Sequence, residues 1–365
     1  MNQLASLAEL GFIFIFSLTN LFFLRKVARK INLVDKPNAR KLHEGTVPLV
    51  GGLSICLSIL FFLLTIAPLT SQVLIYTASI ILLVTVGVID DKYDISFKIR
   101  FLVQGVLSIV MMTMANLDLH TIGNILGTGD IVLGPFSYIV TVIAVIGAIN
   151  AFNMVDGIDG LLGGLSIVTF SGLGVLMLMY GFTDIAYFCL VIIVAIVPYI
   201  LFNLGLLGRQ HKVFMGDAGS MLIGFTVIWM LLMATQEPSS EMRPVTALWL
   251  IAIPLMDMAA IMIRRIRRGD SPFKPDREHL HHICQRLGLS SRQTLAAISL
   301  AAACLAGIGI VGELLNVPEY LMLIGFVVLF LLYLYALTHI WVLTSKFRRG
   351  QANQQANQQA AIDNN

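Results

Sequence analysis

Residues 134–161 read GPFSYIVTVIAVIGAINAFNMVDGIDGL. The first part, 134–151, contains no charged side chain, and about 20 mostly apolar residues are enough for a helix to cross a bilayer. A polar turn at 152–160 then leads into a second apolar stretch, 161–180. This order predicts a membrane-spanning helix, a short loop rich in polar side chains, and a second spanning helix.

The same alternation continues along the whole chain. Of its 365 residues, 57% are hydrophobic and only 12% are charged, about half the charged fraction of ordinary soluble domains. Apolar stretches lie at 8–24, 49–67, 71–89, 99–115, 134–151, 161–180, 185–205, 214–234, 245–263, 294–312 and 320–343. We therefore expect an all-α polytopic membrane protein with about eleven transmembrane helices and no large soluble domain.

The basic residues are confined to alternate connections. These are 25–48, 90–98, 152–160, 206–213 and 264–293, together with the tail from 344. Arg100 begins a helix next to one of them, and Arg243 is the single cation on the other side. Because basic loops stay in the cytoplasm, we expect a periplasmic N-terminus and a cytoplasmic C-terminus.

The two ends of the chain differ in composition from the rest, and each allows a separate prediction. The first apolar stretch has no Lys or Arg before Arg25, so we expect an uncleaved helix whose basic flank, 25–30, reaches lipid headgroups. We expect residues 1–345 to form one membrane domain. The remainder, 346–365, is rich in Gln and Asn, which predicts a disordered cytoplasmic tail.

Acidic residues gather at the membrane boundary on the basic side. Carboxylates near hydrocarbon are costly unless they have partners, so a cluster of them indicates a functional site. On the opposite side, acids such as Asp118, Glu237 and Glu319 are interpreted as residues that solubilise loops.

Two acidic motifs precede the middle of the chain. The first, DDKYD at 90–94, offers the carboxylates from which Mg²⁺ takes oxygen ligands, although it is also compatible with capping of the next helix. The second, NAFNMVDGIDGL at 150–161, combines amides, carboxylates and glycines in one turn, which permits a close approach by a ligand.

Two further motifs follow. VFMGDAGS at 213–220 places Asp217 at a helix start, where the helix N-terminus favours a bound anion. Asp217 either binds the metal that accompanies this anion or merely caps the helix. The long loop 264–293 begins with clustered arginines and ends in HLHH at 279–282. Arginines bind phosphate in bidentate fashion, so we favour phosphate binding there over a zinc site.

These four motifs, in this order on alternate connections, resemble the polyprenyl-phosphate N-acetylhexosamine-1-phosphate transferases. The resemblance covers residues 1–345 and includes Lys36-Pro37 and the segment Pro48-Leu-Val-Gly-Gly52. It implies an enzyme of the bacterial inner membrane that transfers N-acetylglucosamine (GlcNAc) 1-phosphate from UDP-GlcNAc to undecaprenyl phosphate and releases UMP. It further implies the first membrane step of O-antigen or enterobacterial common antigen synthesis.

The resemblance also assigns roles to residues. Catalytic roles are implied for Asp90, Asp91, Asp156 and Asp159, substrate binding for Asn153, Phe214, Arg265, His279, His281 and His282, and metal binding for Asp217 and Asp91. The implied cofactor is Mg²⁺, with Mn²⁺ as the alternative. Membrane lipids are expected partners, nucleic acid is not, and a homo-oligomer is left open. The longer spacing from Asn203 to Phe214 than in the peptidoglycan branch leaves the role of Asn203 undecided.

Two other classes of protein share some of these features. A proton-coupled transporter also clusters carboxylates, but it places them near the bilayer midplane and repeats its halves. Here no repeat is found, and Asp257 alone lies well inside a predicted span, since Glu9 and Asp217 are at the ends of theirs. A CDP-alcohol phosphotransferase would share Asp159-Gly160, but Gly163-Gly164 replaces the Ala-Arg that its signature requires.

Overall fold

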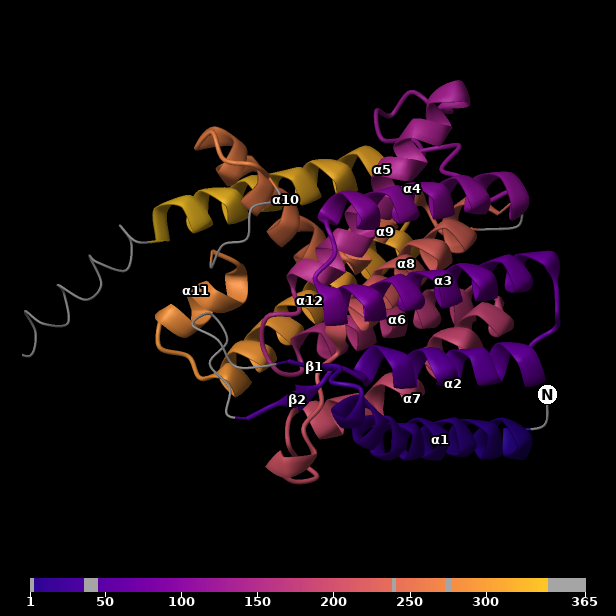
Figure 1. Cartoon of the computed structure of the whole chain (residues 1–365). Helices are drawn as coiled ribbons and strands as arrows, with labels where there is room; N and C mark the ends of the chain where they lie inside the picture. Colours follow the sequence, from indigo (N-terminus) through magenta and orange to yellow (C-terminus); the bar gives the residue numbers. More distant parts are fainter. Residues whose placement is uncertain (1–2, 36–44, 238–240, 273–277, 341–365) are drawn as a thin grey trace, which may run out of the picture.

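The computed structural model describes residues 3–35, 45–237, 241–272 and 278–340, and it is almost entirely helical (Figure 1). The helices are α1 (Gln3–Lys30), α2 (Gly51–Thr65), α3 (Ser71–Tyr93), α4 (Phe97–Met114), α5 (Ser137–Met154), α6 (Leu161–Met179), α7 (Thr183–Asn203), α8 (Gly216–Gln236), α9 (Pro244–Leu250), α10 (Ala252–Arg267), α11 (Leu280–Arg286), α12 (Ser291–Leu314) and a further helix, Glu319–Ile340. Two 3-10 turns, η1 (Gly134–Phe136) and η2 (Arg209–His211), and two strands, β1 (Val34–Asp35) and β2 (Val47–Pro48), complete the described elements.

The helical, polytopic class predicted from the sequence is confirmed. Within the described ranges, nine helices are long and apolar enough to cross a membrane, and the pair α9 and α10 adds one span if it is counted as a unit. Helix α2, with 15 residues, is apolar but shorter. The total of eleven spans and the orientation of the termini stay predictions.

The predicted span 245–263 contains a sharp break, because α9 and α10 meet at an angle of 83°. The break falls at Ile251, three residues before Pro254. A proline has no N–H to donate to the carbonyl four residues earlier, and its ring clashes with that carbonyl. Here that carbonyl belongs to Leu250, the last residue of α9, so the helix ends there.

Helix α8 is the centre of the bundle. In its most apolar 18-residue window, 94% of the residues are buried, whereas α3 and α5 on either side reach 39%. Glycines allow this close packing: a Cβ added at Gly52 of α2 would lie 2.2 Å from the Cα of Gly219, and one at Gly224 would lie 2.5 Å from the Cα of Ile149. Small residues at such crossings let helix backbones approach each other.

One end of the bundle gathers the loops that carry the acidic motifs. In Figure 1 the strands and α11 lie at the end opposite to the labelled N-terminus. Phe214 N–H donates to the Pro48 carbonyl at 2.9 Å, and Gly51 N–H donates to the Phe214 carbonyl at 2.9 Å. These bonds hold the segment before α2 against the segment before α8, which fixes where α8 begins.

Several acids at the other end have structural partners, which corrects for these residues the interpretation that they solubilise loops; Asp130, Asp184 and Glu241 are exposed. Glu319 is 8% exposed and accepts a hydrogen bond from Asn124 N–H at 2.9 Å. Glu237 accepts one from Gln72, and Asp118 one from Ser137. In addition, buried Glu313 pairs with Arg243, with Nε to Oε2 at 3.0 Å. A polar side chain that packs between helices needs a hydrogen-bond partner. These partners come from distant parts of the chain, so the sequence around each acid does not reveal them.

Candidate active site

The N-terminus of α8 is held by Asp91 of α3. The carboxylate of Asp91 accepts the N–H of Asp217 at 2.8 Å and the N–H of Ala218 at 3.3 Å. Gly216 precedes them with φ +75°, and a Cβ there would lie 2.5 Å from Asp91 Oδ2. Only glycine fits this close approach and this backbone conformation. Asp91 therefore satisfies two free N–H groups at the start of α8 and fixes the backbone at Asp217.

Asp217 does not cap its own helix, so that alternative is wrong. Its Oδ1 accepts a hydrogen bond from Asn153 Nδ2 at 2.7 Å, and the same nitrogen lies 2.7 Å from Ser220 Oγ. Its Oδ2 lies 3.6 Å from Arg100 Nη1. The side chain remains 37% exposed, so the carboxylate is oriented by neighbours and still accessible from outside.

Asp90 is buried directly behind this carboxylate. Its Oδ2 pairs with Arg100 Nη1 at 2.7 Å, and its Oδ1 accepts Ile95 N–H at 2.9 Å. Arg100 thus lies between Asp90 and Asp217. The alternative that DDKYD caps the following helix is wrong, because Ser96 caps α4. Asp94, at the end of α3, is exposed with φ +52°.

The turn between α5 and α6 brings the next two aspartates to the same end. Asp159 Oδ2 pairs with Lys212 Nζ at 2.6 Å, and that ammonium lies 5.1 Å from the centroid of the Phe214 ring. Asp156 is exposed on the turn. The undecided Asn203 has a structural role here, since its Oδ1 accepts Gly160 N–H and its Nδ2 donates to the Val213 carbonyl at 2.9 Å. It ties the turn to the segment before α8.

The histidine motif is anchored on Asp257, which lies beyond the bend at the α9–α10 junction. Asp257 is 1% exposed, its Oδ2 lies 2.9 Å from His279 Nδ1, and its Oδ1 accepts the N–H of Leu280 at 3.0 Å and the hydroxyl of Tyr333 at 2.7 Å. The one acid found inside a predicted span therefore holds the start of α11 in place.

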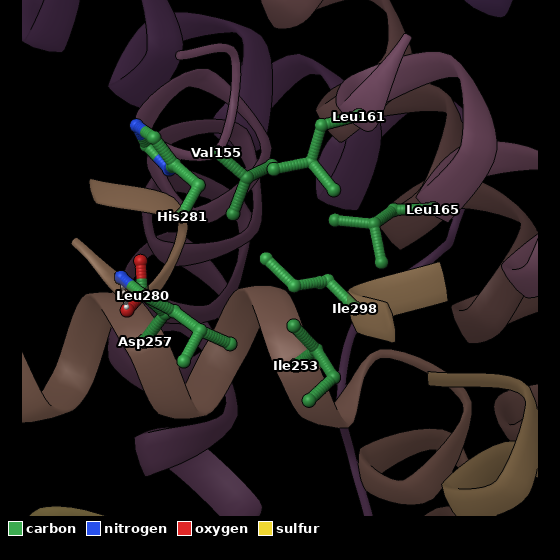
Figure 2. A pocket seen from close by; sticks show the side chains of 8 residues that line it. All are labelled: Val155, Leu161, Leu165, Ile253, Asp257, Leu280, His281 and Ile298. Atoms are coloured by element: carbon green, nitrogen blue, oxygen red, sulfur yellow. Dashed lines mark hydrogen bonds between the residues drawn. The ribbon is translucent and has the colours of Figure 1, made fainter. Parts of the chain in front are cut away.

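His281 points from α11 toward the turn that carries Asp156. Figure 2 shows it on one side of a narrow apolar pocket, with Asp257 next to it and side chains of α6, α10 and α12 across from it. A Cβ added at Gly157 would lie 2.0 Å from His281 Nε2, so only glycine leaves room for the ring. Burial, assisted by the neighbouring His282 and His279, lowers the pKa of His281 to about 3. The His282 ring lies beside it, with the ring centroids 4.2 Å apart and the ring planes tilted by 51°.

The arginines of the long loop are partly committed to protein groups. Glu278 pairs with Arg264 Nη2 at 2.8 Å and also with Arg268. Arg265 is 5% exposed, and its Nη1 donates to the Pro272 carbonyl. These contacts brace the loop beside α11. Residues 273–277, which include Lys274 and Asp276, lie outside the described residues.

The donor set fits Mg²⁺ better than zinc. In the described part of the chain, no group of three or more His, Cys, Asp or Glu side chains is assembled to hold a metal, and zinc sites require such convergence. Mg²⁺ commonly takes one or two carboxylates and completes its shell with water and substrate phosphates. The accessible carboxylate of Asp217, with Asp91 beside it, matches that requirement.

Four site residues were not identified from the sequence: Arg100, Lys212, Asp257 and Ser220. The signal for Arg100 was its place at the start of a helix, ten residues after Asp90, on the side where the acids gather. Lys212 directly precedes the VFMGDAGS motif. Neither position reveals its partner, because the pairs Arg100–Asp217 and Lys212–Asp159 join different helices or loops.

Comparison with known proteins agrees with this geometry. The sequence model of glycosyl transferase family 4 matches residues 73–235, which include the first three motifs. Three similar relatives carry the name undecaprenyl-phosphate alpha-N-acetylglucosaminyl 1-phosphate transferase. They come from Yersinia pestis (54% identical over 93% of this chain and 94% of the relative), Escherichia coli K12 (51%, 96% and 95%) and Haemophilus influenzae (49%, 92% and 95%).

The family model ends at residue 235, but the relatives match nearly the full length of this chain. The similarity therefore also includes the histidine motif at 279–282 and the helices around it. This chain is therefore an enzyme of glycosyl transferase family 4, the polyprenyl-phosphate N-acetylhexosamine-1-phosphate transferases that its four motifs resemble.

Proposed function

We propose that this protein transfers GlcNAc 1-phosphate from UDP-GlcNAc to undecaprenyl phosphate in a bacterial inner membrane. The products are GlcNAc-diphospho-undecaprenol and UMP. The names of the relatives support undecaprenyl phosphate as the acceptor and GlcNAc 1-phosphate as the transferred group. The motif resemblance supports the nucleotide, and we place the reaction at the first membrane step of O-antigen or enterobacterial common antigen synthesis.

One observation carries the proposal: the side chains of Asp90, Asp91, Arg100, Asn153 and Asp217 converge from four helices at one end of an apolar bundle. An accessible carboxylate among buried and half-buried supporting groups suits a reaction between a water-soluble diphosphate and a lipid phosphate. A site at the end of the spans gives both substrates access.

In the proposed reaction, an oxygen of the lipid phosphate attacks the phosphorus attached to the sugar. A new P–O–P link forms, the bond from that phosphorus to the UMP oxygen breaks, and UMP leaves with the electron pair. A phosphate monoester has a second pKa of about 6 and is mostly dianionic at pH 7, so little general-base catalysis is needed. Positioning and charge neutralisation carry the reaction.

The chain's residues divide this task. Asp217, oriented by Asn153, would hold a metal together with Asp91, and Mg²⁺ bound there would neutralise phosphate charge. We assign Asp90 to positioning the lipid phosphate, with Arg100 between it and Asp217.

We assign the binding of the donor substrate, UDP-GlcNAc, to the turn between α5 and α6 and to the loop after α10. Phe214 stacks on uracil, while Asp156 and Asp159 hold the diphosphate and uridine side. His279, His281, His282 and Arg265 bind phosphate and sugar, or hold the loop that does so. Since Glu278 braces the described part of this loop through ion pairs with Arg264 and Arg268, we expect the site to accept one sugar and not a sugar carrying a pentapeptide.

The test uses purified protein, UDP-GlcNAc labelled in the sugar, and undecaprenyl phosphate. We expect labelled lipid and equimolar UMP, little turnover of UDP-MurNAc-pentapeptide, and nearly complete loss of turnover in Asp217→Asn. Asp184→Asn, an exposed acid at the start of α7, is the matched control and stays active. Equal turnover of both donors contradicts the GlcNAc assignment, and release of UMP without labelled lipid contradicts the transfer itself.

A further inference from the structure

The C-terminal end of α1 contains an arginine that is buried and has no anionic partner among the described residues. Arg25 is 7% exposed, and its Nε has no hydrogen-bond partner. It was expected to extend to lipid headgroups with its neighbours; instead it turns into the protein, where its guanidinium carbon lies 5.7 Å from the centroid of the Phe22 ring. Buried charges are normally paired, because removing a charge from water is costly.

A second arginine converges on the same point. Arg25 Nη1 lies 3.5 Å and Arg29 Nη2 lies 3.3 Å from one acceptor, the carbonyl oxygen of Gln210 in η2. Both bonds are longer than the usual 2.7–3.2 Å of N–H···O contacts. Two like charges thus share one neutral oxygen, which satisfies neither of them fully.

Among the described residues, the surroundings of the pair supply no carboxylate that balances it. Within the described residues, no carboxylate lies within ion-pair distance of either arginine. The last turns of α1, FFLRKVARK at 22–30, and the facing segment LGLLGRQHK at 204–212 contain no acidic residue at all. Both segments add further cations, so the local charge favours an anion.

We propose that Arg25 and Arg29, together with the 204–212 segment, bind a phosphate group. Guanidinium groups donate in a fork that matches phosphate oxygens, and an added phosphate supplies the missing anion. The apolar side chains of Phe22 and Phe23 beside the pair are exposed, as expected of a helix surface in contact with lipid. This favours the phosphate of an anionic phospholipid over free phosphate.

The position links this site to the candidate active site. The segment that Arg25 and Arg29 contact continues directly into Lys212, which pairs with Asp159, and into Phe214. A phosphate at the arginine pair therefore holds the loop whose next residues belong to the proposed donor site.

The experiment measures the thermal unfolding of the full-length protein in detergent during titration with phosphatidylglycerol, phosphatidylcholine or inorganic phosphate. The test variant is Arg25→Gln/Arg29→Gln. The control variant is Lys26→Gln/Lys30→Gln, which removes the same charge from exposed positions in the same two turns. We expect phosphatidylglycerol to raise the unfolding temperature of wild type and control, and its apparent affinity to fall about tenfold in the test variant.

The results distinguish a phospholipid site at Arg25 and Arg29 from a site for free phosphate and from no site. An equal affinity loss in both variants, or in neither, overturns the site. Stabilisation by inorganic phosphate at comparable concentration, lost in the test variant, keeps the site but assigns it to free phosphate. If the double variant does not accumulate, Arg29→Gln alone removes only the exposed member. Native mass spectrometry then counts retained phosphatidylglycerol, and retention equal to wild type contradicts the proposal.

Discussion

Neighbouring aspartates in the first motif have different roles because their surroundings differ. Asp90 is buried and ion-paired with Arg100, whereas Asp91 accepts two backbone N–H groups at the start of α8. Asp217 keeps an accessible carboxylate because Asp91 performs the capping. At the scale of single residues, the local partner decides which of three similar carboxylates is free for a ligand.

The Asp90–Arg100 pair gives the first prediction. Because Asp90 is 2% exposed, Arg100→Gln leaves a buried charge without its partner and should lower the free energy of unfolding by about 3 kcal/mol. The double variant Asp90→Asn/Arg100→Gln should recover part of that loss, since both charges are gone. Thermal unfolding in detergent measures the four proteins of this cycle. Additive losses would show that the two side chains are not coupled.

His281 gives a prediction about pH. In the folded protein its pKa is about 3, whereas an unfolded histidine titrates near 6.5. The unfolded state therefore binds more protons between these values, and stability is lost as pH falls from about 6.5 toward 3. Unfolding temperatures at pH 7 and 5 should differ less in His281→Leu than in wild type. His120→Gln, at an exposed position, is the control and should keep the wild-type difference. An unchanged pH dependence in His281→Leu would mean that this ring is not held neutral by burial.

At the scale of helices, glycine positions determine how closely α8 is surrounded. The glycines at the α2–α8 and α5–α8 crossings have backbone atoms where a Cβ would lie. Other helical glycines, such as Gly105 in α4, have nothing within 4 Å of that position. The residue type is the same, but only the first group is required by packing.

This contrast predicts opposite effects for the same substitution. Gly52→Ala should lower the free energy of unfolding by about 2 kcal/mol or more, because the new methyl meets the backbone of Gly219. Gly105→Ala should be neutral or stabilise by about 0.5–1 kcal/mol, since alanine favours a helix where space allows. Unfolding temperature and yield from the membrane fraction are the measurements. Equal behaviour of the two variants would contradict the close α2–α8 contact.

At the scale of the whole molecule, the loops and helix ends that carry the acidic and histidine motifs meet near the strands and α11, whose place in the fold is shown in Figure 1. The Arg243–Glu313 pair instead joins the residue before α9 to the last turn of α12. If basic connections are cytoplasmic, the candidate site faces the compartment that holds nucleotide sugars.

Cysteine labelling tests this orientation. In a variant without the four native cysteines, we expect Lys92→Cys to react with a membrane-impermeant reagent only after the cells are permeabilised. His120→Cys, on the predicted periplasmic side, should react in intact cells. Both positions are exposed, so access of the reagent depends on the side of the membrane. The reverse pattern would place the site in the wrong compartment for its proposed donor.

The sequence alone determined the helical membrane class and the motifs of the site. Each span depends on local hydropathy, and each motif is a short run, so neither needs knowledge of a distant partner. Asp217 and Asp90 were identified because an unpaired carboxylate at a membrane boundary carries a free-energy cost, so a group of them indicates a functional site. The tertiary structure decided the rest: that α8 is central, that the ninth span is bent by 83°, that Asp91 caps α8, and that Arg100 joins two acidic motifs. Apolar stretches of similar length are equivalent in lipid, so their order of burial depends on which small residues meet. A buried polar side chain is fixed by whichever partner the packing brings to it.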